Sequence, residues 1–457
     1  MNLEQSIFKS YDIRGLYPQE LNQEAAGLIA QTFLKMVSDK LDKPIKSLKI
    51  VVGRDIRKAS EPLSQTVIKT FLAYGVQVDN IGLVSINDYY FACGYYKYDA
   101  GIMATASHNP PEYGGFKMVI RGRLPEAIEF ISGQELYARL RNLDFPLAAE
   151  KVSGKLNDKE VWDDHLRHVL SFIGPTEIKP FKAVVDNGNG MNSIFLSKLL
   201  PKLPGEFVPM FFEPDGRFPN RPPNPLAAGA AQAASQKVLA AKADLGFIFD
   251  VDGDRMFLVD ERGHFITGDQ VLLMMIKPML KKYPGAGIAY NLICSKAVPE
   301  LIEKLGGRTL RSEVGYRNVA RHMMEEGGIM SGEVSAHFAF KYNFYADSAF
   351  LALMLVLKTL SDDGRPLSQI IKENYLYARG DEINIIVDDI PAKLEKIRKY
   401  YQANIRDEID GITVEFDRWW FNVRPSNTEP LLRITAEAEN QAELKSRQEE
   451  ILGILNK

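Results

Sequence analysis

The stretch KIVVGRDIR, residues 49–57, contains an apolar run that ends in a charged loop. Such a run, followed by the helix-like sequence SEPLSQTVIKTFLAYG, predicts a buried parallel strand with a crossover helix. The same layout returns in KAVVDNGNGMNS at 182–193 and in GIAYNLICSKA at 287–297. The sequence therefore predicts three similar α/β units.

Each unit also contains a second short apolar run that ends in a polar loop. These runs are GIMATASHNPP at 101–111, LGFIFDVDGDR at 245–255 and GGIMSGEVSAHF at 327–338. Ligands of open α/β sheets usually bind at strand ends. We therefore expect the three loops to form a site.

The C-terminal part follows a different pattern, in which strand-like runs alternate with helix-like segments and predict a small α+β unit. Its loop RPSNTEP, residues 424–430, lies between two strands. A chain of 457 residues exceeds what one core usually holds. The predicted fold is α/β: three similar domains with mixed, largely parallel sheets plus a C-terminal α+β domain, arranged around a central cleft. Their expected bounds are 1–150, 151–256, 257–368 and 369–457.

The composition excludes several classes of protein. A net charge of −3 gives no general attraction to nucleic acid or to anionic lipid. Cys93 and Cys294, the only cysteines, lie too far apart in sequence for a zinc motif or a disulfide framework. The N-terminus lacks the apolar core of a signal peptide, and the longest apolar run, 349–357, is about half of a membrane span. We therefore expect a cytoplasmic protein with no nucleic-acid or membrane partner.

Three loops carry groups with distinct chemistry. In an extended segment, Asp250, Asp252 and Asp254 would share one side, and three converging carboxylates favour a hard cation such as Mg²⁺. A solvated acidic turn is the alternative. Arg424 heads a loop whose hydroxyls, amides and backbone N–H groups suit a phosphate, although a hairpin turn with a surface arginine would look similar. In the third loop, Glu333 fits either sugar hydroxyls or a buried hydrogen-bond network.

The first loop contains the hydroxyl of Ser107 between small residues and two prolines. Serine, asparagine and proline are all turn formers, so this loop could be an ordinary turn. A serine placed beside a metal could instead carry a phosphoryl group, because phosphoryl transfer depends mainly on positioning and charge neutralisation.

Together, TASHNPPEYGGFK, DVDGDR and RPSNTEP resemble the motifs of the α-D-phosphohexomutase family, the phosphomannomutases and phosphoglucomutases, in the family's order and over nearly the whole chain. YDIRG (11–15), GRDIR (53–57) and PDGRFPNRPPNPL (214–226) agree with this resemblance. It implies a phosphoserine at Ser107. The implied Mg²⁺ ligands are Asp250, Asp252, Asp254 and phosphorylated Ser107.

The resemblance also implies the residues around the substrate. Besides Ser107, the catalytic positions would be Arg14, His108, Lys117 and Arg255, with Lys117 as the candidate for moving the hydroxyl proton. The implied sugar and phosphate contacts are Tyr11, Gly315, Tyr316, Glu333, Ser335, His337, Arg424, Ser426, Asn427 and Thr428.

The expected reaction interconverts hexose 1-phosphate and hexose 6-phosphate. Phosphorylated Ser107 would donate its phosphoryl group to either sugar phosphate and form a hexose 1,6-bisphosphate. This intermediate would reorient in the cleft and return its other phosphate to Ser107. The same bisphosphate is expected as the activator. GEVSAHF resembles phosphomannomutases of bacterial polysaccharide pathways, so mannose phosphates are expected, with a phosphoglucomutase or a dual-specificity mutase as the alternative. Val251, Tyr316 and Ala336 depart from the commoner family residues, which are glycine, histidine and glycine.

Two further alternatives follow from the motifs. FIFDVDGD also resembles the strand-end motif of haloacid-dehalogenase-type phosphatases, with Asp250 as nucleophile, but that leaves the Ser107 and Arg424 loops unexplained. A non-catalytic sugar-phosphate-binding paralogue is opposed by the intact serine and aspartates. The expected partners are small hexose phosphates, and the protein is expected to be a monomer or a dimer.

Overall fold

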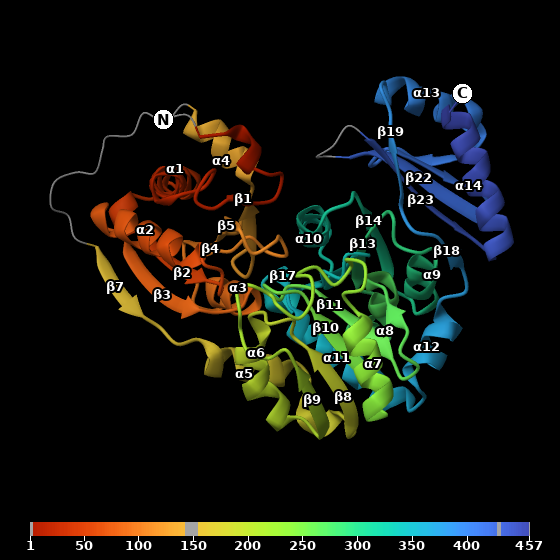
Figure 1. The fold of residues 1–457 in the computed structure, drawn as a ribbon, viewed down its shortest axis with the longest axis horizontal. Coiled ribbons are helices and arrows are strands. Elements are labelled where there is room, and N and C mark those ends of the chain that lie inside the picture. Colours follow the sequence, from red (N-terminus) through yellow and green to blue (C-terminus); the bar gives the residue numbers. More distant parts are fainter. Residues whose placement is uncertain (1–2, 142–153, 427–430, 457) are drawn as a thin grey trace.

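The computed structural model describes residues 3–141, 154–426 and 431–456. Four β-sheets follow one another along the chain. In the view of Figure 1, the N-terminal unit lies on the left, two units lie at the bottom, and the C-terminal unit lies at the upper right. The four-part fold predicted from the sequence is confirmed.

The first sheet has the order β1-β5-β4-β2-β3-β7, with β6 paired to β5. Strands β4, β2, β3 and β7 pair parallel, while β5 pairs antiparallel with β4, with β1 and with β6. The strands are β1 Ile13–Leu16, β2 Lys49–Arg54, β3 Gln77–Leu83, β4 Ala100–Ala104, β5 Tyr113–Arg121, β6 Ile128–Ile131 and β7 Lys155–Asp158. The helices are α1 Gln23–Leu41, α2 Ser60–Ala73, α3 Ile86–Tyr95 and α4 Gly133–Leu140.

The second and third sheets repeat this plan with fewer strands. Their orders are β12-β11-β10-β8-β9 and β14-β13-β15-β16-β17. The second unit contains α5 Trp162–Phe172, β8 Phe181–Asp186, α6 Asn192–Leu199, β9 Gly205–Met210, α7 Gln232–Ala241, β10 Leu245–Phe249, β11 Met256–Asp260 and β12 Phe265–Ile266. The third contains α8 Gly268–Lys282, β13 Gly287–Asn291, α9 Ala297–Lys304, β14 Arg308–Ser312, α10 Tyr316–Glu325, β15 Met330–Gly332, β16 Ala339–Phe340, β17 Ala346–Asp347, α11 Ala349–Asp363 and α12 Leu367–Asn374.

The C-terminal sheet differs, because its strands pair antiparallel in the order β18-β23-β22-β21-β20, with β19 on β23. The unit contains β18 Ala378–Arg379, β19 Ile383–Ile386, α13 Ile390–Tyr400, β20 Ile405–Asp407, β21 Ile412–Glu415, β22 Trp419–Pro425, β23 Leu431–Ala438 and α14 Gln441–Asn456.

The loops singled out in the first three units occupy equivalent places. Each follows a strand that runs parallel to the first long strand of its unit, and each leads into an antiparallel neighbour: β4 into β5, β10 into β11, and β15 into β16. The carboxyl ends of parallel strands lie at one edge of a sheet. Each loop therefore lies at the carboxyl-terminal edge of the parallel strands in its own unit, where ligands of α/β sheets usually bind.

The sheets do not end at the predicted boundaries. Strand β7 pairs with β3 of the first sheet although it follows residue 150, and a boundary after residue 256 divides the hairpin of β10 and β11. The boundary at 368 falls inside α12. The physical reason is that polar segments mark both linkers and hairpin loops, and here the polar segment 250–255 belongs to a hairpin.

The apolar cores divide the molecule differently from the sheets. The second and third units share one continuous core, which contains Val185 and Phe249 of one unit and Leu272 and Leu353 of the other. The C-terminal unit has a core of its own, and the N-terminal unit has a large core of its own and a smaller one that includes Ala346 of the third unit. The two middle units therefore form one packed body.

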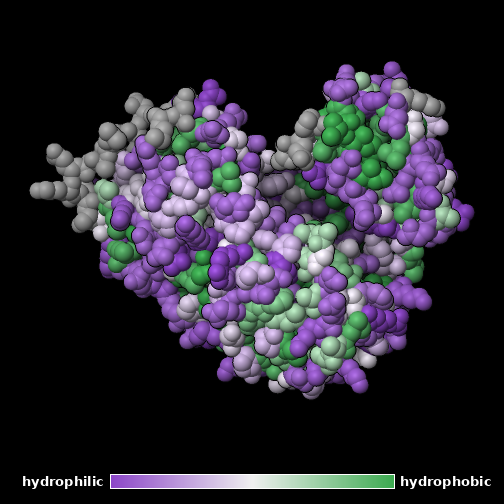
Figure 2. Space-filling model, in the orientation of Figure 1, coloured by the Kyte–Doolittle hydropathy of each residue, from purple (hydrophilic) through white to green (hydrophobic). Residues whose placement is uncertain are grey.

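Figure 2 shows the surface hollowed between the N-terminal unit on the left and the C-terminal unit on the right. Within the described ranges, no helix combines the length and the apolar character needed to cross a lipid bilayer.

Candidate active site

Ser107 lies at the turn that follows β4. Its φ of 51° is in the left-handed region, which is uncommon for a residue other than glycine. Its backbone N–H donates to Thr105 Oγ1 over 2.9 Å, which helps to fix this conformation. The hydroxyl is 3.1 Å from His108 Nδ1 and donates to Asp252 Oδ1 over 3.1 Å. The loops of the first and second units therefore meet at Ser107.

Arg57, which sequence reasoning did not assign to the site, holds this turn by hydrogen bonds to its backbone carbonyls. Its guanidinium donates to the carbonyl of Pro110 at 2.6 Å, to that of Asn109 at 2.6 Å, and to that of Ser107. Asp55 lies beside it, with Oδ2 3.3 Å from Arg57 Nε. The motif GRDIR was the available signal, since it agreed with the family pattern.

The carboxylates of Asp250, Asp252 and Asp254 converge as expected, but the reason differs from the predicted one. Strand β10 ends at Phe249, and the chain then bends through Gly253, whose φ is 95°. One oxygen from each carboxylate lies within 4.8 Å of the others, and all three side chains are fully buried. A turn therefore brings the aspartates together, rather than the alternation of an extended strand.

Two cationic side chains contact this acidic group. Lys117 on β5 donates to Asp252 Oδ2 over 2.7 Å and also to Asp254, while Arg255 Nε donates to Asp250 Oδ2 over 2.8 Å. Burial, reinforced by the neighbouring carboxylates, raises the pKa of Asp250 to about 7. Burial lowers the pKa of Lys117, but Asp252 and Asp254 outweigh it and raise that pKa well above its usual value. Three buried carboxylates facing two cations suit Mg²⁺, which prefers oxygen ligands.

The third loop supplies a hydrogen-bonded chain of side chains. Glu333 accepts from Asn291 Nδ2 and from the N–H of Gly315, both over 3.0 Å, and from Ser335 Oγ over 2.9 Å. Ser335 Oγ is also 2.9 Å from His337 Nδ1. Glu333 is therefore held in place by three donors. Sequence reasoning did not include Asn291, whose only signal was its place at the end of β13.

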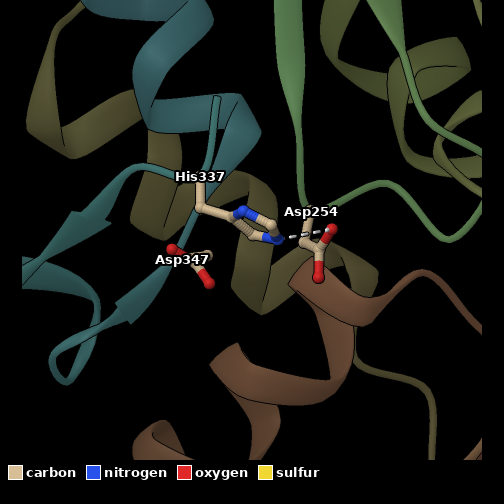
Figure 3. A group of neighbouring side chains, drawn as sticks. All are labelled: Asp254, His337 and Asp347. Atoms are coloured by element: carbon tan, nitrogen blue, oxygen red, sulfur yellow. Dashed lines mark ion pairs between the residues drawn. The ribbon is translucent and has the colours of Figure 1, made fainter. Parts of the chain in front are cut away.

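His337 connects the third loop to the metal loop. Its Nε2 lies 3.5 Å from Asp254 Oδ1, and the carboxylate of Asp347 on β17 lies next to the ring (Figure 3). Both oxygens of Asp347 are buried and without a hydrogen-bond partner among the described residues. Burial, with the charge of His337 opposing and that of Asp254 reinforcing it, raises the pKa of Asp347 to about 7.

Aromatic rings and Arg14 line the site where the first unit meets the third. Tyr316 stacks on His337 with ring centroids 4.7 Å apart and an interplanar angle of 14°, and Tyr11 packs against Tyr316 at 5.4 Å. Arg14 is paired with Asp12 and donates to Asn109 Oδ1 over 2.6 Å. Tyr316 therefore forms part of a buried stack.

Arg424, at the end of β22, is paired with Glu382 Oε2 at 2.5 Å. Glu382 also holds Arg433 at 2.9 Å, and Arg433 donates to Ser426 Oγ over 3.4 Å. Asn427 and Thr428 lie outside the described residues. Among the described residues, Arg424 makes no hydrogen bond or ion pair with the other three loops. The C-terminal unit contacts the third unit instead, for example where the N–H of Val314 donates to Asp410 Oδ2 over 3.2 Å. Glu382 carried no signal in the sequence.

Comparison with protein-family models matches all four units. The models of the phosphoglucomutase/phosphomannomutase α/β/α domains I, II and III match residues 5–139, 163–263 and 267–377, and the model of the C-terminal domain matches residues 382–454. The resemblance drawn from the motifs is therefore confirmed.

Individual proteins agree with the family models. The chain is 35% identical over 452 residues to a phosphomannomutase of Methanocaldococcus jannaschii, covering 99% of this chain and 98% of the relative. It is 34% identical over 455 residues to the phosphohexose mutases of Xanthomonas campestris pv. campestris, covering 98% of each. A crystal structure of a phosphoglucomutase/phosphomannomutase family protein from Burkholderia thailandensis aligns with a TM-score of 0.87 at 30% identity, over 99% of this chain and 98% of that one.

Proposed function

Because the chain belongs to the phosphoglucomutase/phosphomannomutase family and interconverts hexose 1-phosphates and hexose 6-phosphates, we propose that Ser107 carries the phosphoryl group that is transferred. One contact supports this assignment above the others: Ser107 Oγ lies 3.1 Å from Asp252 Oδ1, within the acidic group formed by Asp250, Asp252 and Asp254. These carboxylates and the phosphorylated Ser107 would hold Mg²⁺, which when bound neutralises charge on the transferring phosphoryl group.

The proposed transfer is balanced within the site. The phosphoryl group leaves Ser107 Oγ as the P–O bond to serine breaks, and a new P–O bond forms to the free hydroxyl of the hexose phosphate. The proton of that hydroxyl ends on Ser107 Oγ. Lys117 is the proposed carrier of this proton: its raised pKa keeps it charged, so it would give a proton to Ser107 Oγ as it takes up the proton of the sugar hydroxyl. Its position agrees with this role, because Lys117 and Ser107 both contact Asp252. Arg14 and Arg255 bring positive charge close to the reacting phosphoryl group, and His108 contacts the serine hydroxyl.

The remaining loops would hold the sugar. Glu333 and Ser335 offer fixed acceptor and donor groups for sugar hydroxyls, beside Gly315, Tyr316, His337 and Tyr11. Arg424 and Ser426, with Asn427 and Thr428 of the same loop, would hold the phosphate that is not reacting. Since Arg424 is paired with Glu382, the phosphate would compete with this carboxylate for the guanidinium of Arg424 or share the guanidinium with it. A substrate that touches Arg424 and Ser107 together would draw the C-terminal unit toward the first.

Arg424→Ala is expected to lower kcat/KM by about tenfold or more in both directions of the reaction, since a charge-assisted hydrogen bond to phosphate is lost. Both kcat and KM should change, because binding energy remote from the reacting atoms also positions the sugar. Steady-state kinetics of the forward and reverse reactions measures this.

Arg418→Ala is the matched control, because Arg418 is an exposed arginine of the same unit that pairs with Glu439. Its kinetics should stay near wild type. If Arg424→Ala also kept near-normal kcat/KM in both directions, the non-reacting phosphate would have to be held elsewhere.

We further propose that mannose phosphates are the preferred substrates, from the loop GEVSAHF and from the phosphomannomutases among the relatives. Mannose 1-phosphate and glucose 1-phosphate should both react, with kcat/KM for mannose at least as high, because the two sugars differ only at C2. An added or lost contact there is worth about 1–3 kcal/mol. Kinetics with both sugars and with N-acetylglucosamine 1-phosphate, each with a trace of hexose 1,6-bisphosphate as activator, tests this. A clear preference for the N-acetylated sugar would contradict it.

A further inference from the structure

The segment DGRFPNRPPN, residues 215–224, belongs to the second unit but lies against Ile56 and Arg57 of the first, in the loop that follows β2. At Gly216 the backbones of the two segments are in close contact: a Cβ added there would lie 2.6 Å from the carbonyl oxygen of Ile56 and 3.0 Å from Arg57 Cα. Phe218 follows, buried at 7% exposure and with a φ of 48°. Its ring centroid is 4.9 Å from Arg57 Cζ, which is within the range of a cation–π contact.

Arg57 connects Phe218 to the nucleophile loop, because its guanidinium lies over the ring and also donates to the carbonyl of Ser107. Its side chain is 1% exposed and donates to three carbonyls of the nucleophile loop, those of Ser107, Asn109 and Pro110. A buried guanidinium that is held on one face by a ring and at its edges by carbonyls has little freedom to move. The position of Phe218 therefore restricts the position of the nucleophile loop.

The other end of the segment is attached to the metal loop. Arg221 Nε donates to both oxygens of Asp186 over 3.0 Å, and its Nη2 donates to the carbonyl of Phe249, the residue directly before Asp250. Asn224 Oδ1 accepts from Arg255 Nη1 over 3.2 Å. Arg221 is itself confined, because a Cβ on Gly188 would lie 2.5 Å from its Cζ.

We propose that residues 215–224 align the phosphoserine loop with the metal loop, and that Phe218 is a positioning residue for Ser107. The inference rests on the proposed role of Ser107. It adds an explanation of how Ser107 in the first unit is kept in a fixed position relative to the three aspartates of the second unit. A displacement of about 1 Å in such a site can lower the rate about 10²-fold.

Phe218→Ala tests the proposal, with Phe218→Tyr as the conservative variant. Phe218→Ala should lower kcat by about 10-fold to 100-fold and leave KM for the hexose phosphate unchanged, because the sugar is held by the third and fourth loops. Phe218→Tyr keeps an aromatic face over Arg57 and should retain near wild-type kcat. Phe212→Ala is the control, since Phe212 is a half-buried phenylalanine nearby that packs against the core of the middle units.

Hydrogen–deuterium exchange on the protein without metal or substrate gives a second readout. The peptide that covers residues 104–113 should exchange faster in Phe218→Ala, and not in Phe212→Ala or Phe218→Tyr. Unchanged exchange of this peptide, or an equal loss of kcat in Phe212→Ala, would overturn the proposal. An active Ser107→Ala variant would instead refute the proposed function. The exchange experiment is independent of that outcome, because it tests only whether Phe218 restrains the loop around Ser107.

Discussion

Ser107→Ala is expected to fold and to bind hexose phosphates, yet to lose mutase turnover by about 10³-fold or more, as removal of a nucleophile typically does. The change deletes one buried oxygen, whose hydrogen bond to Asp252 Oδ1 is 3.1 Å long. The neighbouring hydroxyl of Thr105 is held in a different role, because Thr105 Oγ1 accepts from the N–H of Ser107. Coupled kinetics with hexose 1,6-bisphosphate present measures the loss.

Intact-protein mass measurement completes this test. The wild-type chain should gain the mass of one phosphoryl group on incubation with hexose 1,6-bisphosphate, and Ser107→Ala should not. Ser64→Ala is the matched control, because Ser64 is a buried serine of α2 that donates to the carbonyl of Glu61. Retained phosphorylation of the peptide around residue 107, or most of the activity retained in Ser107→Ala, would exclude this serine as the carrier.

Asp252→Asn has the second largest expected effect, a fall in kcat of about 10²-fold to 10³-fold, the range reported for the loss of one electrostatic stabiliser. Asp252 contacts both Ser107 and Lys117, so the change weakens metal binding and the placement of the lysine together. The free energy of unfolding without metal should change little or rise, because three buried carboxylates facing Lys117 and Arg255 are reduced to two.

Thermal unfolding with and without Mg²⁺ separates these effects. A metal that binds only the folded state raises Tm, so wild type should gain stability with added Mg²⁺ and Asp252→Asn should gain less. Asp79→Asn is the control, since Asp79 is a buried aspartate on β3 that accepts from Tyr98 and Asn157. An unchanged Mg²⁺ response in Asp252→Asn would indicate an ordinary acidic turn.

The fold could be predicted well because its central strands are buried on both faces and read as continuous apolar runs. β8 and β10 are examples. β7 could not be predicted, because its four residues, KLND, are mostly exposed and carry no apolar pattern. The predicted domain boundaries differ from the ends of the sheets for the same reason, because a linker, an edge strand and a hairpin loop can have similar polar sequences.

The convergence of side chains was predictable where they stand in one short stretch, as with the three aspartates around Gly253. It was not predictable where a residue acts on distant backbone. Arg57 binds carbonyls 50 to 53 positions further along the chain, and nothing in the sequence pairs them. Glu382 likewise reaches Arg424 only through the pairing of β19 with β23 and of β23 with β22.

The core shared by the second and third units bears on how relatives of this chain can recombine. A crossover between β12 and α8 would join two halves of one interior taken from different parents, and close-packed interiors tolerate such mismatches poorly. A crossover after α12 would leave the separate C-terminal core intact. Natural or engineered chimaeras should therefore exchange the two middle units together and the C-terminal unit alone, so that the C-terminal loop, with the phosphate binding proposed for it, could be inherited apart from the metal loop.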